Sequence, residues 1–214
     1  MKKAVIFDMD GVIINSESIW QTAEKEVFST LGVIMDKESC AQTQSMTTNE
    51  VTRFWFSKNP WQGKGFVEVE QLVINRVIEL IQKEDCVIDG IQNTVHQLKA
   101  RNLKIGLATN SPFRIIPEVL SKSQFTCQFD AITSAEFENH GKPDPSVYFT
   151  TSRKLEEFSQ HCVAIEDSNS GIMAAKQAGM TVIGFTNEGR NTDLSNTDHT
   201  IDSYSNVDWD LYLQ

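Results

Sequence analysis

Two carboxylates, one residue apart, follow an apolar run near the start of the chain. The segment VIFDMDGVI has the composition of a buried strand, yet it carries Asp8 and Asp10. Burying an unpaired carboxylate costs roughly several kcal/mol even after relaxation, so this pair needs a metal, a cation or solvent beside it. If the strand stays extended, both side chains point to one side while Met9 faces away, and Gly11 permits a sharp turn directly afterwards. The pair therefore belongs at a strand end.

Polar clusters follow three further apolar runs of the chain. They are Thr109-Asn110-Ser111, Lys142 within HGKPDP, and Glu166-Asp167. In an open parallel sheet, ligands bind beyond the carboxyl ends of the strands. A single DxD pair often arises by chance, whereas four clusters in order, each at the expected end of a strand, do not. We therefore expect these side chains to meet at one edge of a sheet.

The segments around two of these clusters have local features that suit phosphate binding. Ser111 fits the N-cap of a following helix and Pro112 fits its first turn. Free backbone N–H groups at such a helix start would suit a phosphate. Lys142 stands between Gly141 and Pro143, a stiff setting that can hold an ammonium group in a fixed direction.

A charge count indicates which group the site lacks. Asp8, Asp10, Glu166 and Asp167 together contribute −4, and Lys142 reduces this to −3. A phosphate would not approach such a site, but one divalent cation brings the charge to −1 and protonation of Asp10 brings it to zero. Ligands that are all oxygen atoms favour Mg²⁺ over zinc. The sequence therefore predicts magnesium if the protein binds phosphate.

The elements that must position these residues alternate along most of the chain. Short runs rich in Val, Ile, Leu and Phe predict strands at 4–8, 103–109, 131–134, 162–167 and 181–185. Helical patterns occupy 91–100, 113–122, 146–155 and 171–178. This alternation predicts right-handed βαβ units, and hence an α/β fold with a parallel sheet covered on both faces.

The region after the first strand differs from this alternation. It has no convincing strand, and helical periodicity appears at 20–31, 49–57 and 67–81. A block of this size indicates an inserted subdomain, so we expect a core formed by 1–14 and 85–214 and a helical insertion at 15–84. At the C-terminus we expect a last helix that packs Trp209 and Leu211 against the core.

Aromatic residues are frequent in the expected insertion. They are Trp20, Trp55, Phe56 and Trp61. Large apolar side chains at helical spacing usually pack against neighbouring helices. We expect this packing role for all four, in preference to a place in a binding pocket.

Composition narrows the class of protein. The 214 residues are 40% hydrophobic and 22% charged, as in ordinary globular proteins, and the net charge of −10 disfavours binding to nucleic acid or to an anionic membrane. The four cysteines are scattered without a CxxC pair, as expected for reduced thiols. The start MKKAVIFDMDG lacks the pattern of a signal peptide, and no segment has the length of a membrane span. We expect a cytoplasmic monomer whose partner is a small molecule.

Four motifs together resemble those of a known superfamily. FDMDGV, ATNS, GKPDP and AIEDSNSG are similar to the four ordered motifs of the haloacid dehalogenase superfamily of phosphotransferases. The second Asp of DxD separates the chain from the dehalogenase branch. The helical insertion resembles the C1-type cap of the β-phosphoglucomutase-like subgroup. WFSKNPW and the overall length resemble bacterial phosphatases that act on 2-deoxyglucose 6-phosphate and hexitol phosphates. The resemblance implies a Rossmann-like core.

The resemblance also implies roles for the acidic residues. Asp8 would be the nucleophile that forms an aspartyl-phosphate. Asp10 would protonate the leaving alcohol and then activate water. Mg²⁺ would be held by the Asp8 carboxylate, the Asp10 backbone carbonyl and Asp167, while Glu166 would support the metal from behind or through water.

Contacts with the substrate are implied in the same way. Thr109 and Lys142 would bind the phosphoryl oxygens that are transferred. Asn110 and Ser111 would bind the phosphate or the adjacent part of the substrate.

One stretch departs from the subgroup pattern. Relatives usually carry a Gly followed shortly by an Arg that reaches the second phosphate of a substrate or intermediate. In this chain TQSMTTNEV has Ser45 in the Gly position and Thr47 and Thr48 where Arg is expected. This departure weakens the assignment of a mutase.

The resulting hypothesis is a Mg²⁺-dependent phosphatase of small phosphorylated metabolites, such as sugar or sugar-alcohol phosphates. Three alternatives stay open. The first is a phosphomutase of the β-phosphoglucomutase type. The second is a phosphonate hydrolase, which would need a Schiff-base lysine such as Lys58 or Lys64 of the insertion. The third is a catalytically silent binding or regulatory module, against which the intact set of acids argues.

Overall fold

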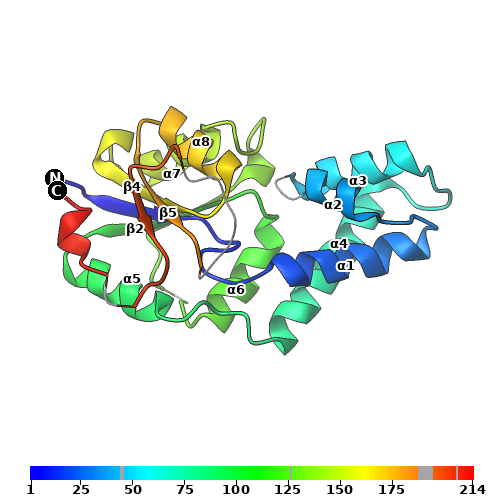
Figure 1. Cartoon of the computed structure of the whole chain (residues 1–214), viewed down its shortest axis with the longest axis horizontal. Helices are drawn as coiled ribbons and strands as arrows, with labels where there is room; N and C mark the ends of the chain where they lie inside the picture. The colour runs from blue at the N-terminus through cyan, green and yellow to red at the C-terminus, as the bar shows by residue number, and fades with distance from the viewer. Residues whose placement is uncertain (44–45, 126, 188–194, 206) are drawn as a thin grey trace.

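The core of the protein is a parallel sheet of six strands in the order β3-β2-β1-β4-β5-β6 (Figure 1). The computed structural model describes residues 1–43, 46–125, 127–187, 195–205 and 207–214. The strands are β1 (Ala4–Phe7), β2 (Lys104–Thr109), β3 (Ala131–Ser134), β4 (Cys162–Glu166), β5 (Thr181–Phe185) and β6 (His199–Ile201). All neighbouring pairs run parallel.

The central strand β1 is apolar on both faces because helices cover both sides of the sheet. Val5 lies in register with Ile105 of β2 and with Val163 of β4, and every residue of β1 is fully buried. Parallel strands buried on both faces read as continuous apolar runs. This burial explains why AVIF could be recognised as a strand.

Four helices cover the two faces of the sheet. They are α5 (Ile91–Ala100), α6 (Ile116–Lys122), α7 (Ser146–Lys154) and α8 (Asn169–Gln177). Val5 packs into the same apolar cluster as α5 and α6, whereas Ile6 packs with α7 and α8. Figure 1 accordingly shows α5 and α6 below the sheet and α7 and α8 above it. The predicted α/β class is confirmed.

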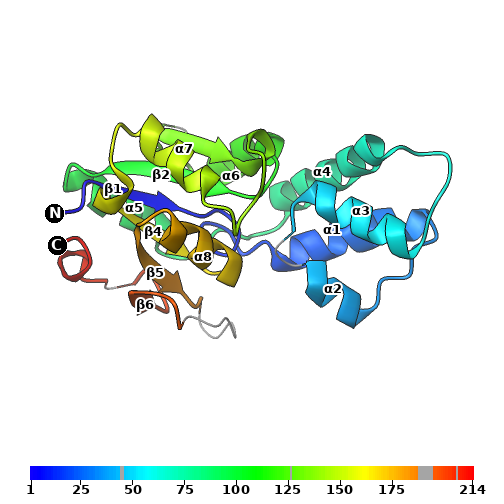
Figure 2. The ribbon, with the colours of Figure 1, turned by 90° about the horizontal axis from the view of Figure 1, so that it is seen from above.

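Four helices between β1 and α5 form a group to one side of the sheet (Figure 2). They are α1 (Glu17–Thr30), α2 (Lys37–Thr43), α3 (Thr48–Lys58) and α4 (Phe66–Lys83), called here the helical insertion. Trp55 is fully buried there, and its ring centroid lies 6.3 Å from that of Phe28. Trp61 packs edge-on against Phe56 at 4.9 Å. Burying one such side chain stabilises the fold by about 1.5–3 kcal/mol.

Several predicted boundaries need correction. The first strand ends at Phe7, one residue earlier than predicted. The N–H of Asp8 still donates to the carbonyl of Ile165 at 3.0 Å, but the chain turns away from the sheet at this residue. The segment 113–115 is a 3₁₀ turn that leads into α6. Helix α2 and strand β6 were not predicted, because both are short and lack a clear apolar period.

The C-terminal prediction was wrong in part. The expected last helix is a single 3₁₀ turn, Trp209–Leu211, in which Trp209 is buried but Leu211 is 61% exposed. A single turn presents one side chain to the core, so the second apolar residue faces solvent. Within the part of the chain that the structure describes, no helix has the length and apolar character needed to cross a bilayer.

Candidate active site

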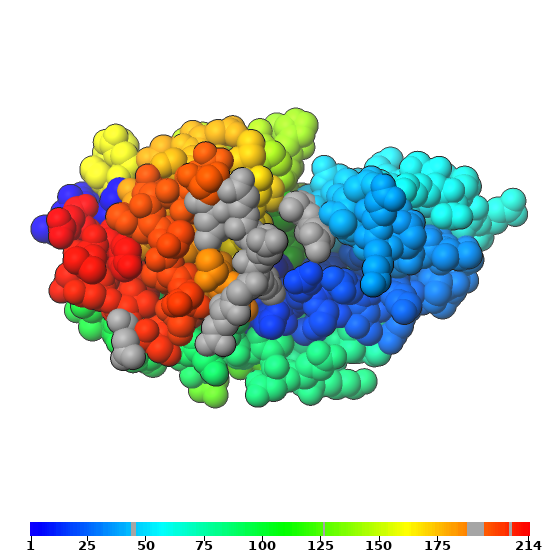
Figure 3. All heavy atoms as spheres, viewed as in Figure 1, coloured from blue at the N-terminus to red at the C-terminus, as the bar shows by residue number. Residues whose placement is uncertain are grey.

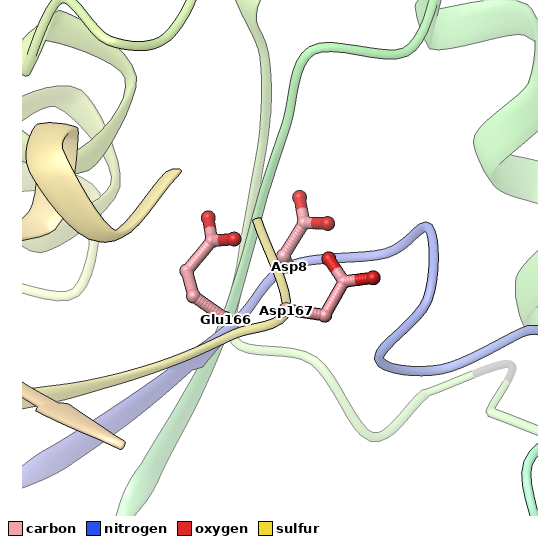
Figure 4. A group of neighbouring side chains, drawn as sticks. All are labelled: Asp8, Glu166 and Asp167. Carbon is pink, nitrogen blue, oxygen red and sulfur yellow. The ribbon is translucent and has the colours of Figure 1, made fainter. Parts of the chain in front are cut away.

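Three acidic side chains meet where β1 and β4 end (Figure 4). Asp8 follows β1 directly, Glu166 is the last residue of β4, and Asp167 comes next. One carboxylate oxygen of each lies within 4.8 Å of the others. Glu166 is fully buried, and Asp8 and Asp167 are 7% and 9% exposed. The predicted convergence of these strand ends is therefore what the structure shows.

Lys142 lies inside this acidic group. Its Nζ donates hydrogen bonds to Oδ1 of Asp8 and Oε1 of Glu166, both at 2.6 Å, and to the Ala108 carbonyl at 2.8 Å. Burial disfavours its charged form, but the two carboxylates outweigh this and raise the pKa of Lys142 above its ordinary value. The residue is therefore a buried ammonium whose three hydrogens all have acceptors.

Among the described residues, Lys142 is the cation paired with this group of acids, and one positive charge does not balance three carboxylates. Burial is the largest cause that raises the pKa of the Asp8 carboxyl well above its usual value; Lys142 opposes the rise, and the neighbouring acids add to it. Ionised Asp8 therefore needs further positive charge beside it. The carboxylates of Asp8 and Asp167 supply the oxygen atoms that a hard divalent cation prefers.

Glu166 is less available to such a cation than its position suggests. Its Oε1 accepts hydrogen bonds from Lys142 and from the hydroxyl of Tyr148, and its Oε2 accepts one from Ser168 at 3.3 Å. Tyr148 comes from α7 and is fully buried. Sequence reasoning missed it, because a single tyrosine in a helix carries no motif. With its oxygens engaged in this way, Glu166 is better placed to orient Lys142 than to bind a metal.

Asp10 accepts hydrogen bonds from three donors, two at the start of α1 and one just after β2. Its Oδ1 accepts hydrogen bonds from Ser16 Oγ at 2.6 Å and from Trp20 Nε1 at 2.9 Å, and its Oδ2 accepts one from Ser111 Oγ at 2.6 Å. Trp20 packs against the apolar core as expected, but the assumption that packing is its only role was wrong. Ser16 was not singled out, because a serine before a helix reads as an ordinary cap.

The residues at the end of β2 form a hydrogen-bonded turn. The N–H of Ser111 donates to Thr109 Oγ1 at 3.0 Å, and the Ser111 carbonyl accepts from Ser134 Oγ at 2.6 Å. Asn110 Oδ1 accepts from the N–H of Lys142 at 2.8 Å and so fixes the loop that carries the lysine. These contacts join the ends of β2 and β3 and attach the loop of Lys142 to the end of β2.

The predicted N-cap at Ser111 was wrong. Pro112 precedes a 3₁₀ turn without a side-chain cap, and α6 begins only at Ile116, with a different proline in its first turn. The Ser111 hydroxyl donates instead to Asp10, whose carboxylate is the stronger acceptor. Ser111 is therefore part of the acidic site rather than a helix start.

The start of α8 places Glu166 through a close approach of the backbone. Ser168 is the N-cap, as predicted, and its Oγ accepts from the N–H of Gly171 at 3.1 Å. A Cβ atom at Gly171 would lie 2.1 Å from the Glu166 carboxylate. Only glycine fits at this position while Glu166 keeps its place.

Comparisons with known proteins identify the family of this chain. The model of the haloacid dehalogenase-like hydrolase family matches residues 5–185. Hexitol phosphatase B of Escherichia coli (strain K12) is 37% identical over 181 residues, which cover 84% of this chain and 82% of that protein. Beta-phosphoglucomutase of Bacillus subtilis (strain 168) is 31% identical over 189 residues, covering 85% and 82%.

The fold is also similar to that of a solved structure. A crystal structure of beta-phosphoglucomutase from Clostridium difficile aligns with a TM-score of 0.86, covering 99% of this chain and 96% of that one. The two sequences are 24% identical, so this likeness concerns the fold.

Proposed function

We propose that this chain, which belongs to the haloacid dehalogenase-like hydrolases, is a Mg²⁺-dependent phosphatase of small phosphorylated metabolites such as sugar-alcohol phosphates. The observation that carries the proposal is the buried contact between Lys142 and Asp8 at 2.6 Å, with Asp167 beside it and Asp10 two residues on. A phosphatase relative with 37% identity supports the same reaction. We further propose that residues 15–84 form the cap over this site.

The proposed mechanism has two displacements at phosphorus. In the first, an Asp8 carboxylate oxygen forms the O–P bond of an aspartyl-phosphate while the ester O–P bond breaks, and Asp10 gives its proton to the departing alcohol. In the second, Asp10 takes a proton from water, whose oxygen forms a bond to phosphorus while the Asp8 O–P bond breaks; this releases inorganic phosphate and restores the Asp8 carboxylate and the protonated Asp10. Bound Mg²⁺, held by Asp8, the Asp10 carbonyl and Asp167, would neutralise negative charge during both steps.

The surrounding residues position the groups that react in these steps. Ser16, Trp20 and Ser111 hold the Asp10 carboxyl group in one orientation. Lys142 would hold a phosphoryl oxygen beside Asp8, and Glu166 keeps the lysine charged and in place. Such fixed positioning is the main contribution a protein makes to phosphoryl transfer.

The helical insertion favours a phosphatase over a mutase. Thr47 is the N-cap of α3, and Glu50 Oε2 accepts hydrogen bonds from its N–H at 2.7 Å and its hydroxyl at 2.8 Å. Both side chains thus serve the start of the helix, and 43–51 contains no Lys or Arg for a second phosphate. Ser45, expected in the Gly position, lies outside the described residues. Thr47 also borders the loop of Lys142, since a Cβ on Gly141 would lie 2.8 Å from its methyl group.

The lysines of the insertion do not support a phosphonate hydrolase. Lys58 Nζ donates to Ser39 Oγ at 2.6 Å, and Lys64 pairs with Glu68 at 2.6 Å on the exposed side of α4. Each ammonium is engaged within the insertion, away from the acidic site. A Schiff base would need a lysine amine that is free to react with the substrate, whereas both of these ammonium groups already have partners inside the insertion.

Phosphorus NMR can separate the phosphatase from the mutase. With hexose or hexitol 6-phosphates we expect net release of inorganic phosphate, and with β-glucose 1-phosphate we expect no conversion to glucose 6-phosphate. The physical reason is the missing cation: a bisphosphate intermediate needs a charge-assisted contact for its second phosphate. Both reactions should be followed at the same enzyme concentration. Isomerisation faster than phosphate release would show a mutase.

A Gly171→Ala substitution tests the role assigned to Glu166. The added Cβ would collide with the Glu166 carboxylate, which must then move away from Lys142. Displacing a positioning group by about 1 Å can cost about 100-fold, and we expect a loss of that order in p-nitrophenyl phosphate turnover. Gly65→Ala is the matched control, because nothing lies within 4 Å of its Cβ position. Equal rates for both variants would refute the positioning role.

A further inference from the structure

The face of helix α1 that contacts Asp10 continues along the helix beyond Trp20. Ser16, just before the helix, and Trp20 in its first turns both donate to Oδ1 of Asp10. Residues four apart share one face of a helix, so Glu24 follows Trp20 on this face, about 6 Å further along the axis. Figures 1 and 2 show α1 running from the end of β1 into the insertion, alongside α4.

Glu24 is half-buried rather than in open solvent. Burial, followed by the charge of Glu24, raises the pKa of the Cys40 thiol of α2, which places the carboxylate near that helix. The chain then passes from α2 to Thr47, which borders the loop of Lys142. In Figure 3 the surface is hollowed between the insertion and the sheet-bearing part of the molecule.

The fold itself makes no use of the Glu24 carboxylate. Other acids of the insertion are engaged: Glu26 pairs with Arg76 at 2.5 Å, and Asp36 accepts from Ser39 at 2.6 Å. For Glu24 no hydrogen-bond or ion-pair partner is found among the described residues. Burial raises its pKa to about 7, which is the cost of holding a carboxyl group there without a donor. A ligand that brings donors would remove that cost.

We propose that the Glu24 carboxylate accepts hydrogen bonds from hydroxyl groups of the departing alcohol, and so selects polyhydroxylated monophosphates. This inference rests on the proposed phosphatase function and names its specificity residue. The position of Glu24 along α1 suits this role. The leaving group must extend from Asp10 away from the phosphate, and Trp20, which contacts Asp10, precedes Glu24 by one turn of α1. A carboxylate attracts neutral hydroxyl donors and repels a second phosphate, so bisphosphates are excluded from this end of the site.

Steady-state kinetics with two substrates test this role. Glucitol 6-phosphate has hydroxyl groups throughout its leaving group, whereas p-nitrophenyl phosphate has none. A hydrogen bond to a charged group is worth roughly 10- to 100-fold in binding. We expect Glu24→Gln to lower kcat/KM for glucitol 6-phosphate by that factor, mainly through KM, and to lower it for p-nitrophenyl phosphate by at most about threefold. Glu24→Asp should recover part of the loss.

Two comparisons make the outcome decisive. Glu26→Gln removes the same charge from the side of α1 that faces α4, and it should leave both substrates unaffected. Analogues of glucitol 6-phosphate that each lack one hydroxyl should include one that the wild-type enzyme hydrolyses more slowly than the parent compound. Glu24→Gln should hydrolyse that analogue and the parent compound at the same rate. Equal losses for both substrates would show a structural role, and unchanged kinetics would show no contact; either overturns the inference. A wild-type protein that hydrolyses neither substrate would instead refute the proposed function.

Discussion

Replacing Asp8 by asparagine is expected to abolish turnover, by a factor of about 10⁴ or more, while the fold remains intact. The amide nitrogen that replaces one carboxylate oxygen is a poor nucleophile. The remaining amide oxygen is uncharged and too weakly nucleophilic to form an acyl phosphate. The remaining amide oxygen can still accept the hydrogen bond from Lys142, which now reaches Asp8 at 2.6 Å. Loss of rate should therefore come without loss of structure.

Turnover of p-nitrophenyl phosphate with Mg²⁺ is the measurement for this variant, and circular dichroism on heating checks the fold. Asp85→Asn is a suitable control because the same change is made at an exposed position outside the site. If the Asp8→Asn protein retains activity within tenfold of the wild type, the covalent mechanism fails.

Removing divalent metal is expected to have the second-largest effect. EDTA should lower activity at least about 100-fold, because a bound cation supplies several kcal/mol of charge stabilisation during phosphoryl transfer. Mg²⁺ should restore the rate. Ca²⁺ should bind without supporting turnover, because its larger shell of oxygen atoms would misplace Asp8 relative to phosphorus. The acidic group of Asp8, Glu166 and Asp167 gives this expectation its basis.

Thermal unfolding gives a readout of metal binding that does not depend on activity. A ligand present at 100 times its dissociation constant stabilises the native state by about 2.7 kcal/mol, so Mg²⁺ should raise Tm. Asp167→Asn should weaken this shift, whereas Asp85→Asn should not. Full activity in excess chelator would contradict the charge argument on which the magnesium site depends.

The sequence by itself determined the residues of the charged centre. Strands buried on both faces are continuous apolar runs, so the carboxylates that interrupt them had to lie at strand ends. Parallel strands bring those ends to one edge, which was enough to predict that Asp8, Lys142, Glu166 and Asp167 meet. The charge of these four residues and Asp10 could be summed before any contact was known.

Local capping was predicted well only where no stronger partner competed. Ser168 caps α8 as expected, because its hydroxyl lies beside the free N–H of Gly171. The hydroxyl of Ser111 has the Asp10 carboxylate within reach and donates to it. Nothing in the local sequence could reveal this choice, since the two residues are 101 positions apart.

Only the tertiary structure decided which neutral and distant side chains complete the site. Trp20 and Tyr148 look like ordinary packing residues, and their polar atoms find Asp10 and Glu166 because α1 and α7 are docked at particular angles. Glu24 reads as a surface residue of an amphipathic helix, yet the fold leaves it half-buried and burial raises its pKa to about 7. Sequence periodicity fixes which residues share a face, whereas the partner of that face depends on how helices far apart in the chain pack together.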